Sequence, residues 1–89
     1  MDFNLEFSRE ADIEFNTIDC FFGAIGVGER FHKDFHLQMM RIQSNPFQFQ
    51  VRYGDIRIVH LKDFKYSIHY NVVNNTITVL RILNQHQSY

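Results

Sequence analysis

The sequence predicts an α+β domain in which a helical hairpin packs on a mostly antiparallel four-stranded sheet, in the order strand, helix, helix and three further strands. Apolar residues recur every three or four positions between residues 11 and 42, a spacing typical of amphipathic helices. From residue 47 the spacing changes to two, which is typical of half-buried strands. The chain has 89 residues, enough for one core, so residues 1–89 are treated as a single domain.

Residues 3–25 predict the first strand and the first helix. Phe3, Leu5 and Phe7 alternate with polar neighbours and indicate a short strand with one buried face. Ser8 follows, and its hydroxyl can accept a backbone amide hydrogen bond at the start of a helix. The apolar face of that helix recurs at steps of four and three, through Ala11, Phe15, Ile18, Phe22 and Ile25.

A tight turn at Gly23, Gly26 and Gly28 is expected to lead into the second helix. The apolar face of this helix consists of Phe31, Phe35, Met39 and Ile42. The helix is expected to end at residues 44–46, because the residue before a proline is restricted away from the helical conformation. Two amphipathic helices joined by a short turn predict the hairpin.

The C-terminal half predicts strands. Phe47, Phe49 and Val51 alternate with polar residues before a turn expected at residues 54–55. A meander of three strands is expected to follow, over residues 56–61, 66–72 and 76–83.

The last strand carries apolar residues on both of its expected faces. Ile77 and Val79 are expected on one face, and Leu80 and Ile82 on the other. This pattern indicates a central strand that is covered on both sides.

The net charge of -1 conceals an uneven distribution of charge along the chain. Residues 1–30 hold seven acidic and two basic side chains, whereas residues 31–89 hold seven basic and three acidic side chains and all five histidines. Two interpretations are open. The basic half can form a face that meets an acidic partner, or the acidic helix can pair with the basic sheet of the same chain.

Composition excludes several classes of protein. The longest strongly apolar run, residues 20–28, is far shorter than the roughly 20 residues that span a bilayer, so no membrane association is expected. The N-terminus is acidic, where a secretory signal is basic. Cys20 is the only cysteine and cannot form an internal disulfide, and we expect it to be a packed or half-buried thiol. These features favour a cytoplasmic location.

Several stretches of the chain resemble one family. They are the helix start at residues 8–11, the break at Asn45-Pro46, VRYGDIR at residues 51–57, LKDFKYSIHY at residues 61–70 and ITVLRILN at residues 77–84. This ordered set resembles the RelE/ParE toxin superfamily of type II toxin-antitoxin systems over nearly the whole chain. The branch it is most similar to is ParE, the plasmid stabilisation proteins.

The resemblance implies an intracellular toxin that is neutralised by a cognate antitoxin whose C-terminal segment wraps over the toxin surface. ParE-like members are linked to poisoning of DNA gyrase, whereas RelE-like members cleave messenger RNA at the ribosome. We expect a ParE-like toxin that inhibits growth through a gyrase-type target. The alternatives are a RelE-like ribosome-dependent endoribonuclease and an inactive relative that only binds the antitoxin. No cofactor is expected, and a homodimer or a toxin-antitoxin hetero-oligomer is allowed.

The sequence departs from the family pattern at two places. Lys65 stands where the family commonly has proline, and residues 84–89 lack the arginine with which relatives often end. In the ribonuclease branch a basic residue near His86 would stabilise phosphate charge, and a histidine is a weaker, pH-dependent substitute.

Two sets of candidate residues follow. A basic and aromatic surface for the antitoxin or target would use Arg52, Arg57, Lys62, Lys65, Tyr66, Tyr70 and Arg81. A ribonuclease would need a base, an acid and cations, which Arg57, His60, Lys62, Arg81, His86 and Tyr89 can supply.

Simpler explanations stand beside both sets. His60 and Arg57 lie at odd spacing on one strand and would point to opposite faces. His60 and His69 can be ordinary strand residues, and Arg81 can pair with an acidic residue of the first helix. His32 and His36 have metal-ligand spacing but no third ligand, so no metal site is expected.

Overall fold

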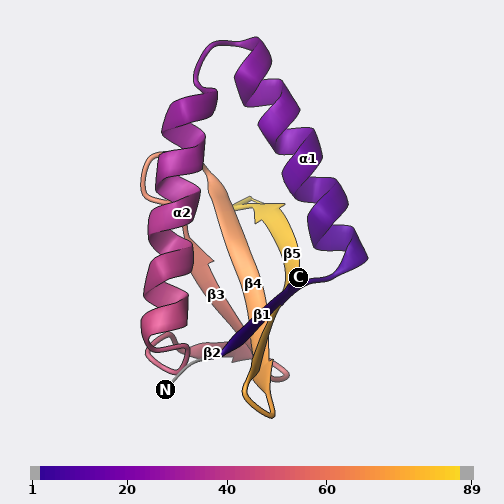
Figure 1. Ribbon diagram of the computed structural model, residues 1–89, viewed down its shortest axis with the longest axis vertical. Coiled ribbons are helices and arrows are strands. Elements are labelled where there is room, and N and C mark those ends of the chain that lie inside the picture. The colour runs from indigo at the N-terminus through magenta and orange to yellow at the C-terminus, as the bar shows by residue number, and fades with distance from the viewer. Residues whose placement is uncertain (1–2, 87–89) are drawn as a thin grey trace.

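The computed structural model describes residues 3–86, which form two helices packed on one face of a five-stranded sheet (Figure 1). The elements in chain order are β1 (Asn4–Phe7), α1 (Arg9–Ala24), α2 (Gly28–Ser44), β2 (Val51–Tyr53), β3 (Ile56–His60), β4 (Tyr66–Val73) and β5 (Thr76–Asn84). The predicted α+β class and helical hairpin are confirmed. Within the described residues, neither helix is long and apolar enough to cross a membrane.

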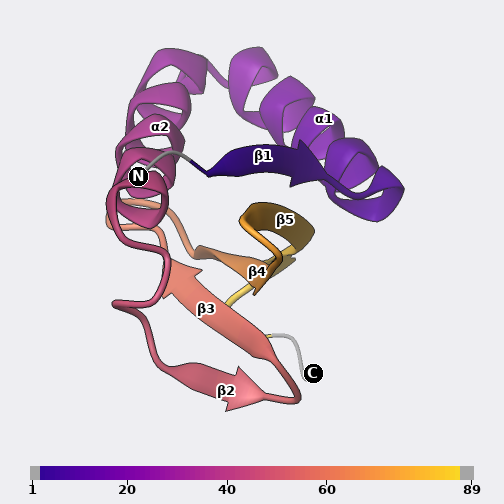
Figure 2. The same ribbon diagram turned by 60° about the horizontal axis from the view of Figure 1, so that its bottom comes forward.

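The sheet has five strands in the order β1-β5-β4-β3-β2, one more than predicted. Strands β2 to β5 form antiparallel neighbours, whereas β1 pairs in parallel with β5 from Asn4 opposite Thr76 to Phe7 opposite Val79. The sheet is therefore mixed. Figure 2 shows the two helices on the same side of the sheet, with β1 at its edge.

The extra strand, β2, begins only at Val51, although apolar alternation begins at Phe47. A turn occupies the start of that segment, because Asn45 accepts two backbone hydrogen bonds beyond the helix end. Its Oδ1 atom accepts from the amide of Phe47 at 3.1 Å, and its carbonyl accepts from the amide of Gln48 at 3.2 Å.

Ser8 joins the start of α1 to the middle of β5. Its Oγ atom accepts a hydrogen bond from the amide of Ala11 at 3.0 Å, which confirms the predicted N-cap. The same hydroxyl donates to the carbonyl of Leu80 at 2.7 Å, and the amide of Ser8 donates to the carbonyl of Val79 at 2.9 Å. The first helix is thereby fixed to the sheet at its N-cap residue.

Strand β5 contains a bulge that changes which side chains face the helices. His69 of β4 lies opposite Arg81, but the next residue, Tyr70, lies opposite Val79, so Leu80 is an extra residue on β5. The prediction that Ile82 lies on the face opposite Val79 is therefore wrong. The bulge returns Ile82 to the helix side, where it is 2% exposed.

The core lies between the helices and the inner face of the sheet. Its fully buried aromatic residue on the helix side is Phe31 of α2, which contacts the rings of Phe15, Phe22 and Phe64 at centroid distances of 5.8, 5.2 and 5.6 Å. Truncating a buried phenylalanine to alanine costs about 3–5 kcal/mol. The sheet contributes the inward side chains Val59, Ile68, Tyr70, Ile77, Val79 and Ile82.

The turn between the helices is tight. Gly26 adopts a φ of +85°, which favours glycine, and a Cβ atom on Gly28 would lie 3.3 Å from the Cα atom of Gly23. The glycines thus allow α1 and α2 to approach closely at their junction, as predicted.

Candidate functional site

The basic residues predicted to form one surface are divided between the two faces of the sheet. Arg57 of β3 lies opposite Tyr70, whose side chain is in the core, whereas His60 lies opposite Ser67 on the other face. Arg57 and His60 therefore point to opposite faces, as their odd spacing predicts.

Arg57 holds the segment that follows α2. Its Nη1 atom donates to the carbonyl of Phe49 at 2.5 Å, and its guanidinium lies 5.3 Å from the ring centroid of Phe47. Tyr70 acts on the same segment, because its hydroxyl donates to the carbonyl of Pro46 at 2.5 Å. Tyr70 is fully buried, and burial raises its pKa to about 12. The expectation that Tyr70 contacts a partner is corrected by this burial.

Lys62 and Lys65 are exposed on the loop between β3 and β4. Asp34, a buried residue of α2, fixes this loop by accepting the amide of Lys62 at 3.0 Å and the amide of Asp63 at 2.7 Å. Lys62 therefore lies beside α2 and lines a groove of about 380 Å³ together with Arg30, Lys33, His36, Leu37 and Met40. Tyr66, at the start of β4, is half-buried against Phe22.

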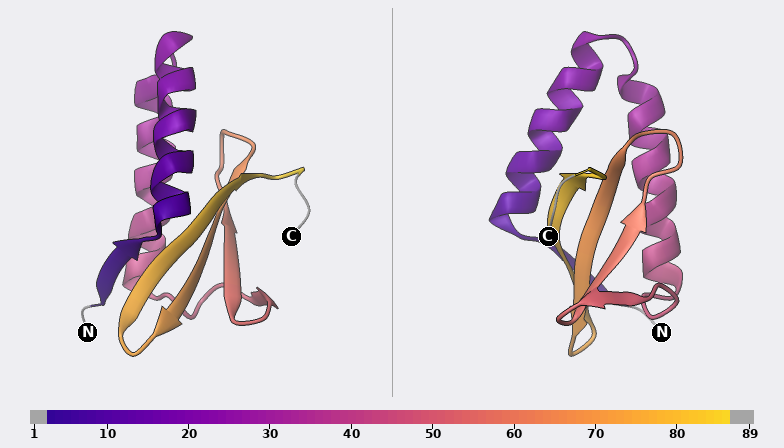
Figure 3. Two further views of the ribbon diagram at one scale, coloured as in Figure 1. Left: turned by 90° about the vertical axis from the view of Figure 1, so that its right-hand side faces the viewer. Right: turned by 180° about the vertical axis from the view of Figure 1, so that it is seen from behind.

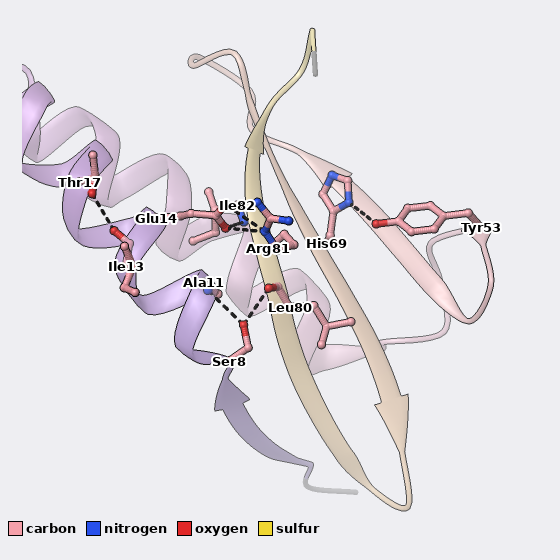
Figure 4. Close-up of polar contacts among 10 residues, drawn as sticks. All are labelled: Ser8, Ala11, Ile13, Glu14, Thr17, Tyr53, His69, Leu80, Arg81 and Ile82. Carbon is pink, nitrogen blue, oxygen red and sulfur yellow. Dashed lines mark hydrogen bonds and ion pairs between the residues drawn. The ribbon is translucent and has the colours of Figure 1, made fainter. Parts of the chain in front are cut away.

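Arg81 is paired with Glu14 of α1 (Figure 4). Its Nε atom lies 2.9 and 3.1 Å from the two carboxylate oxygens, and its Nη2 atom lies 2.6 Å from Oε2. Oε1 also accepts the amide of Ile82 at 2.9 Å. The hydrogen bond to Glu14 raises the pKa of Arg81. For this pair, the acidic helix does bind the basic sheet of the same chain.

The face of the sheet away from the helices carries a polar cluster that the sequence prediction missed as a site. No helix of residues 3–86 covers this face (Figure 3). His60 and Ser67 approach at 2.5 Å between Nδ1 and Oγ, and Tyr53 and His69 at 2.9 Å between the hydroxyl and Nδ1. His60, Ser67 and His69 line a cavity of about 230 Å³ together with Arg52, Ile58, Asn84 and Gln85. Burial, then the charges of Arg81 and His60, lowers the pKa of His69.

The predicted ribonuclease residues do not gather at this cluster as a set. His60 and Arg81 belong to the outer face, Arg57 to the inner face and Lys62 to a loop beside α2. His86 lies in the turn after β5, where its amide donates to the side chain of Asn84 at 2.9 Å. Tyr89 lies outside the described residues.

Ile13 and Phe21 of α1 and Ile25 at its C-terminal cap are exposed apolar side chains, here called the apolar patch on α1. These side chains are 56, 57 and 57% exposed. Ile13 also lines a groove of about 250 Å³ between α1 and the sheet, together with Glu14, Thr17, Ile18, Tyr66 and Ile82. Cys20 is also exposed on α1, because it lies on the side of the helix that faces away from the core, so the expected packed thiol is wrong.

Metal ligands do not gather anywhere in residues 3–86, where no group of three or more histidine, cysteine, aspartate or glutamate side chains could hold an ion. His32 instead contacts the carboxylate of Asp19 and links α2 to α1. His36 lines the groove beside Lys62.

Comparison with known proteins gives one family and one fold. A family model described as "ParE toxin of type II toxin-antitoxin system, parDE" matches residues 5–89. A solved structure titled "Chromosomal ParDE TA system from P. aeruginosa" is similar, with a TM-score of 0.74, 22% sequence identity and coverage of 92% of this chain and 95% of that chain. At this identity the structural similarity shows the fold alone. No curated protein matches.

Proposed function

The chain belongs to the ParE toxin family of type II toxin-antitoxin systems. On that premise we propose that it inhibits growth by binding a gyrase-type protein target in the cytoplasm, and that a cognate antitoxin neutralises it by covering its surface. The observation that carries this proposal is the family match, which extends over residues 5–89 and therefore includes both helices and all of the sheet except Asn4.

The apolar patch on α1 supports action by protein contact. Ile13, Phe21 and Ile25 are more than half exposed, and exposed aliphatic and aromatic side chains are typical anchors of an interface. An antitoxin helix that places its own apolar face along α1 would bury the patch. Among the predicted basic contacts, Arg52, Lys62 and Lys65 are exposed on β2 and on the β3–β4 loop, where they can meet acidic side chains of a partner.

The ribonuclease alternative has weaker support. General acid-base catalysis needs its groups within hydrogen-bonding reach of the same reacting atoms. Arg57 is occupied by the carbonyl of Phe49 on the inner face, and Lys62 lies beside α2, so neither accompanies His60. Arg81 shares the outer face with His60, but Glu14 binds its guanidinium. An inactive relative that only binds the antitoxin is the remaining alternative.

Growth measurements test the proposal directly. Expression of the chain alone should arrest growth, and co-expression of the short open reading frame beside its gene should restore it. Arrest with a DNA-damage response and intact transcripts supports a gyrase-type target. Rapid loss of messenger RNA would favour the ribonuclease, whereas unimpaired growth with a stable complex between the two proteins would favour the inactive relative.

A matched pair of variants tests the surface. Phe21→Asp and Val73→Asp each replace an exposed apolar residue, 57 and 51% exposed, on α1 and at the end of β4 respectively. We expect Phe21→Asp to weaken toxicity or antitoxin binding and Val73→Asp to leave both unchanged. Circular dichroism should show that both variants remain folded, and equal loss in the two variants would refute an α1 interface.

A further inference from the structure

The groove between α2 and the β3–β4 loop combines basic side chains with exposed apolar ones. Its volume is about 380 Å³, and each described residue that lines it belongs to α2 or to this loop, so it is separate from the apolar patch on α1. We propose that the groove binds an acidic amphipathic helix of the antitoxin. That the helix belongs to the antitoxin rests on the proposed function, whereas its acidic and apolar character rests on the groove alone.

The apolar part of the groove continues a stripe of residues along α2. Leu37 and Met40 are 48 and 53% exposed. They follow Arg30 and Lys33 at steps of three, four and three, so the four residues lie on one side of the helix. The stripe extends over about 15 Å, at ~1.5 Å per residue. A partner helix with the same alternation of three and four can follow it over this length, which is the helix-in-groove mode of recognition.

Three basic side chains give the groove its positive charge. Lys33 and Lys62 are exposed and make no ion pair within residues 3–86. The guanidinium of Arg30 lies 5.9 Å from the ring centroid of Phe64 in the β3–β4 loop. Arg30 also lies in the first turn of α2, where the helix dipole disfavours a basic side chain. The stability of α2 therefore does not account for this cation, whereas an acidic partner would be attracted by the cation and the dipole together.

The carboxylates nearby do not cancel this charge. Asp34 is 5% exposed, and its negative charge is compensated by the amides of Lys62 and Asp63, which donate to it at 3.0 and 2.7 Å. Asp63 is then the one exposed carboxylate among the described residues of the groove, and Glu29 lines a neighbouring cavity instead. Apolar side chains and a remaining carboxylate favour a protein helix over a nucleic acid, whose contacts are mainly with phosphate.

Peptide titrations of the full-length protein near neutral pH test the proposal, by fluorescence anisotropy and two-dimensional amide NMR. The probe is a synthetic peptide of about 18 residues, long enough to form a helix, with leucines along one face and glutamates beside them. We expect saturable binding that shifts the amide resonances of Lys33 and Leu37 and weakens as salt is added. A peptide with lysine in place of each glutamate should bind about tenfold more weakly or worse.

Charge reversal in the groove locates the site. Lys33→Glu and Lys62→Glu should each weaken binding of the glutamate peptide by about fivefold or more, since attraction is replaced by repulsion. Arg9→Glu, at the exposed first residue of α1, is the control with the same change in net charge and should weaken binding by at most about twofold. The double variant Lys33→Glu/Lys62→Glu should bind the lysine peptide more tightly than the wild type does, a gain that loss of folding cannot produce.

Five results would overturn the proposal. They are no saturable binding, an equal loss of affinity in Arg9→Glu, no gain for the lysine peptide in the double variant, equally tight binding of polyglutamate without leucines, and tighter binding of a short single-stranded oligonucleotide than of the peptide.

Binding of the purified product of the neighbouring open reading frame separates this proposal from the proposed function. Weaker binding to the Lys33→Glu/Lys62→Glu variant than to the wild type supports the groove as an antitoxin site. Equal binding to both overturns this proposal while the proposed function stands. Failure to bind even the wild type refutes the proposed function and the identification of the partner, and the peptide titration then decides the chemistry of the groove.

Discussion

Among the acidic side chains of α1, Glu14 should be the one whose removal lowers the free energy of unfolding most. Its carboxylate binds the guanidinium of Arg81 through two nitrogens and also accepts the backbone amide of Ile82 at 2.9 Å. Strand β1 pairs with β5 only as far as Val79, so Glu14 takes the place of a neighbouring strand at Ile82. Glu14→Ala therefore removes an ion pair and leaves a strand amide without this acceptor.

The magnitude follows from the exposure of each contact. The Arg81 side chain is 46% exposed and that of Glu14 21%, and an exposed ion pair contributes about 0.2–1 kcal/mol. A hydrogen bond from a partly buried amide to a charged acceptor contributes about 1.5–3 kcal/mol. We expect Glu14→Ala to lower the free energy of unfolding by about 2–3 kcal/mol and Arg81→Ala by about 0.5–1 kcal/mol. Glu14→Gln keeps an acceptor for Ile82 and should cost about 1 kcal/mol.

Urea unfolding followed by circular dichroism measures these differences. For a domain of this size, a loss of 2 kcal/mol lowers Tm by about 8–16 °C. Asn16→Ala, an exposed change on the same helix, is the control and should stay within about 0.5 kcal/mol of the wild type. If Glu14→Ala lowers the free energy of unfolding no more than Arg81→Ala does, the hydrogen bond from the amide of Ile82 to Glu14 does not stabilise the fold, and this prediction is refuted.

Three further predictions concern stability. Ser8→Ala should cost about 1–2 kcal/mol in urea unfolding, since the helix cap and the bond to the carbonyl of Leu80 are lost together; a cost below about 0.3 kcal/mol would contradict this. Asp34→Ala should cost about 2–3 kcal/mol and speed hydrogen exchange at the amide of Lys62, and unchanged exchange would count against the loop anchor. Tyr70 has a folded pKa of about 12, above its ordinary 10.0, so its contribution to stability is full below pH 10.0 and is lost as pH rises to about 12. An absorbance titration should show a late-ionising tyrosine that Tyr70→Phe removes, and its persistence in that variant would refute the assignment.

The helical hairpin was predictable because its signals are local. Apolar spacing, the Ser8 cap and the Asn45-Pro46 break each act within a few residues. The structure confirms the cap, the break and the apolar spacing except at Ile25, which follows α1 and is 57% exposed. The parallel pairing of β1 with β5 was not predictable, since no property of residues 4–7 identifies a partner more than 70 positions away. The bulge at Leu80 was also missed, because alternation along one strand does not reveal how many residues oppose the neighbouring strand.

The site was harder to predict than the fold. The sequence analysis expected the basic residues on one surface. Strand alternation instead places Arg57 on the inner face of the sheet, and the loop that Asp34 holds places Lys62 beside α2. His69 was treated as an ordinary strand residue, although its spacing of two from Ser67, which places both on one face of β4, was the available signal. That signal becomes readable only once the register between β3 and β4 is known.

The parallel contact between β1 and β5 has a consequence for how the protein is made. Ser8 and Leu80, which are joined by a hydrogen bond, are 72 residues apart in the chain. Closing a loop of that length costs about 4 kcal/mol in chain entropy, so the contact forms only with the rest of the sheet in place. A ribosome adds about 5–20 residues per second, so the residues of β5 are synthesised seconds after those of the helical hairpin. Truncated products that stop before β5 should contain helix-forming segments without an assembled toxin surface.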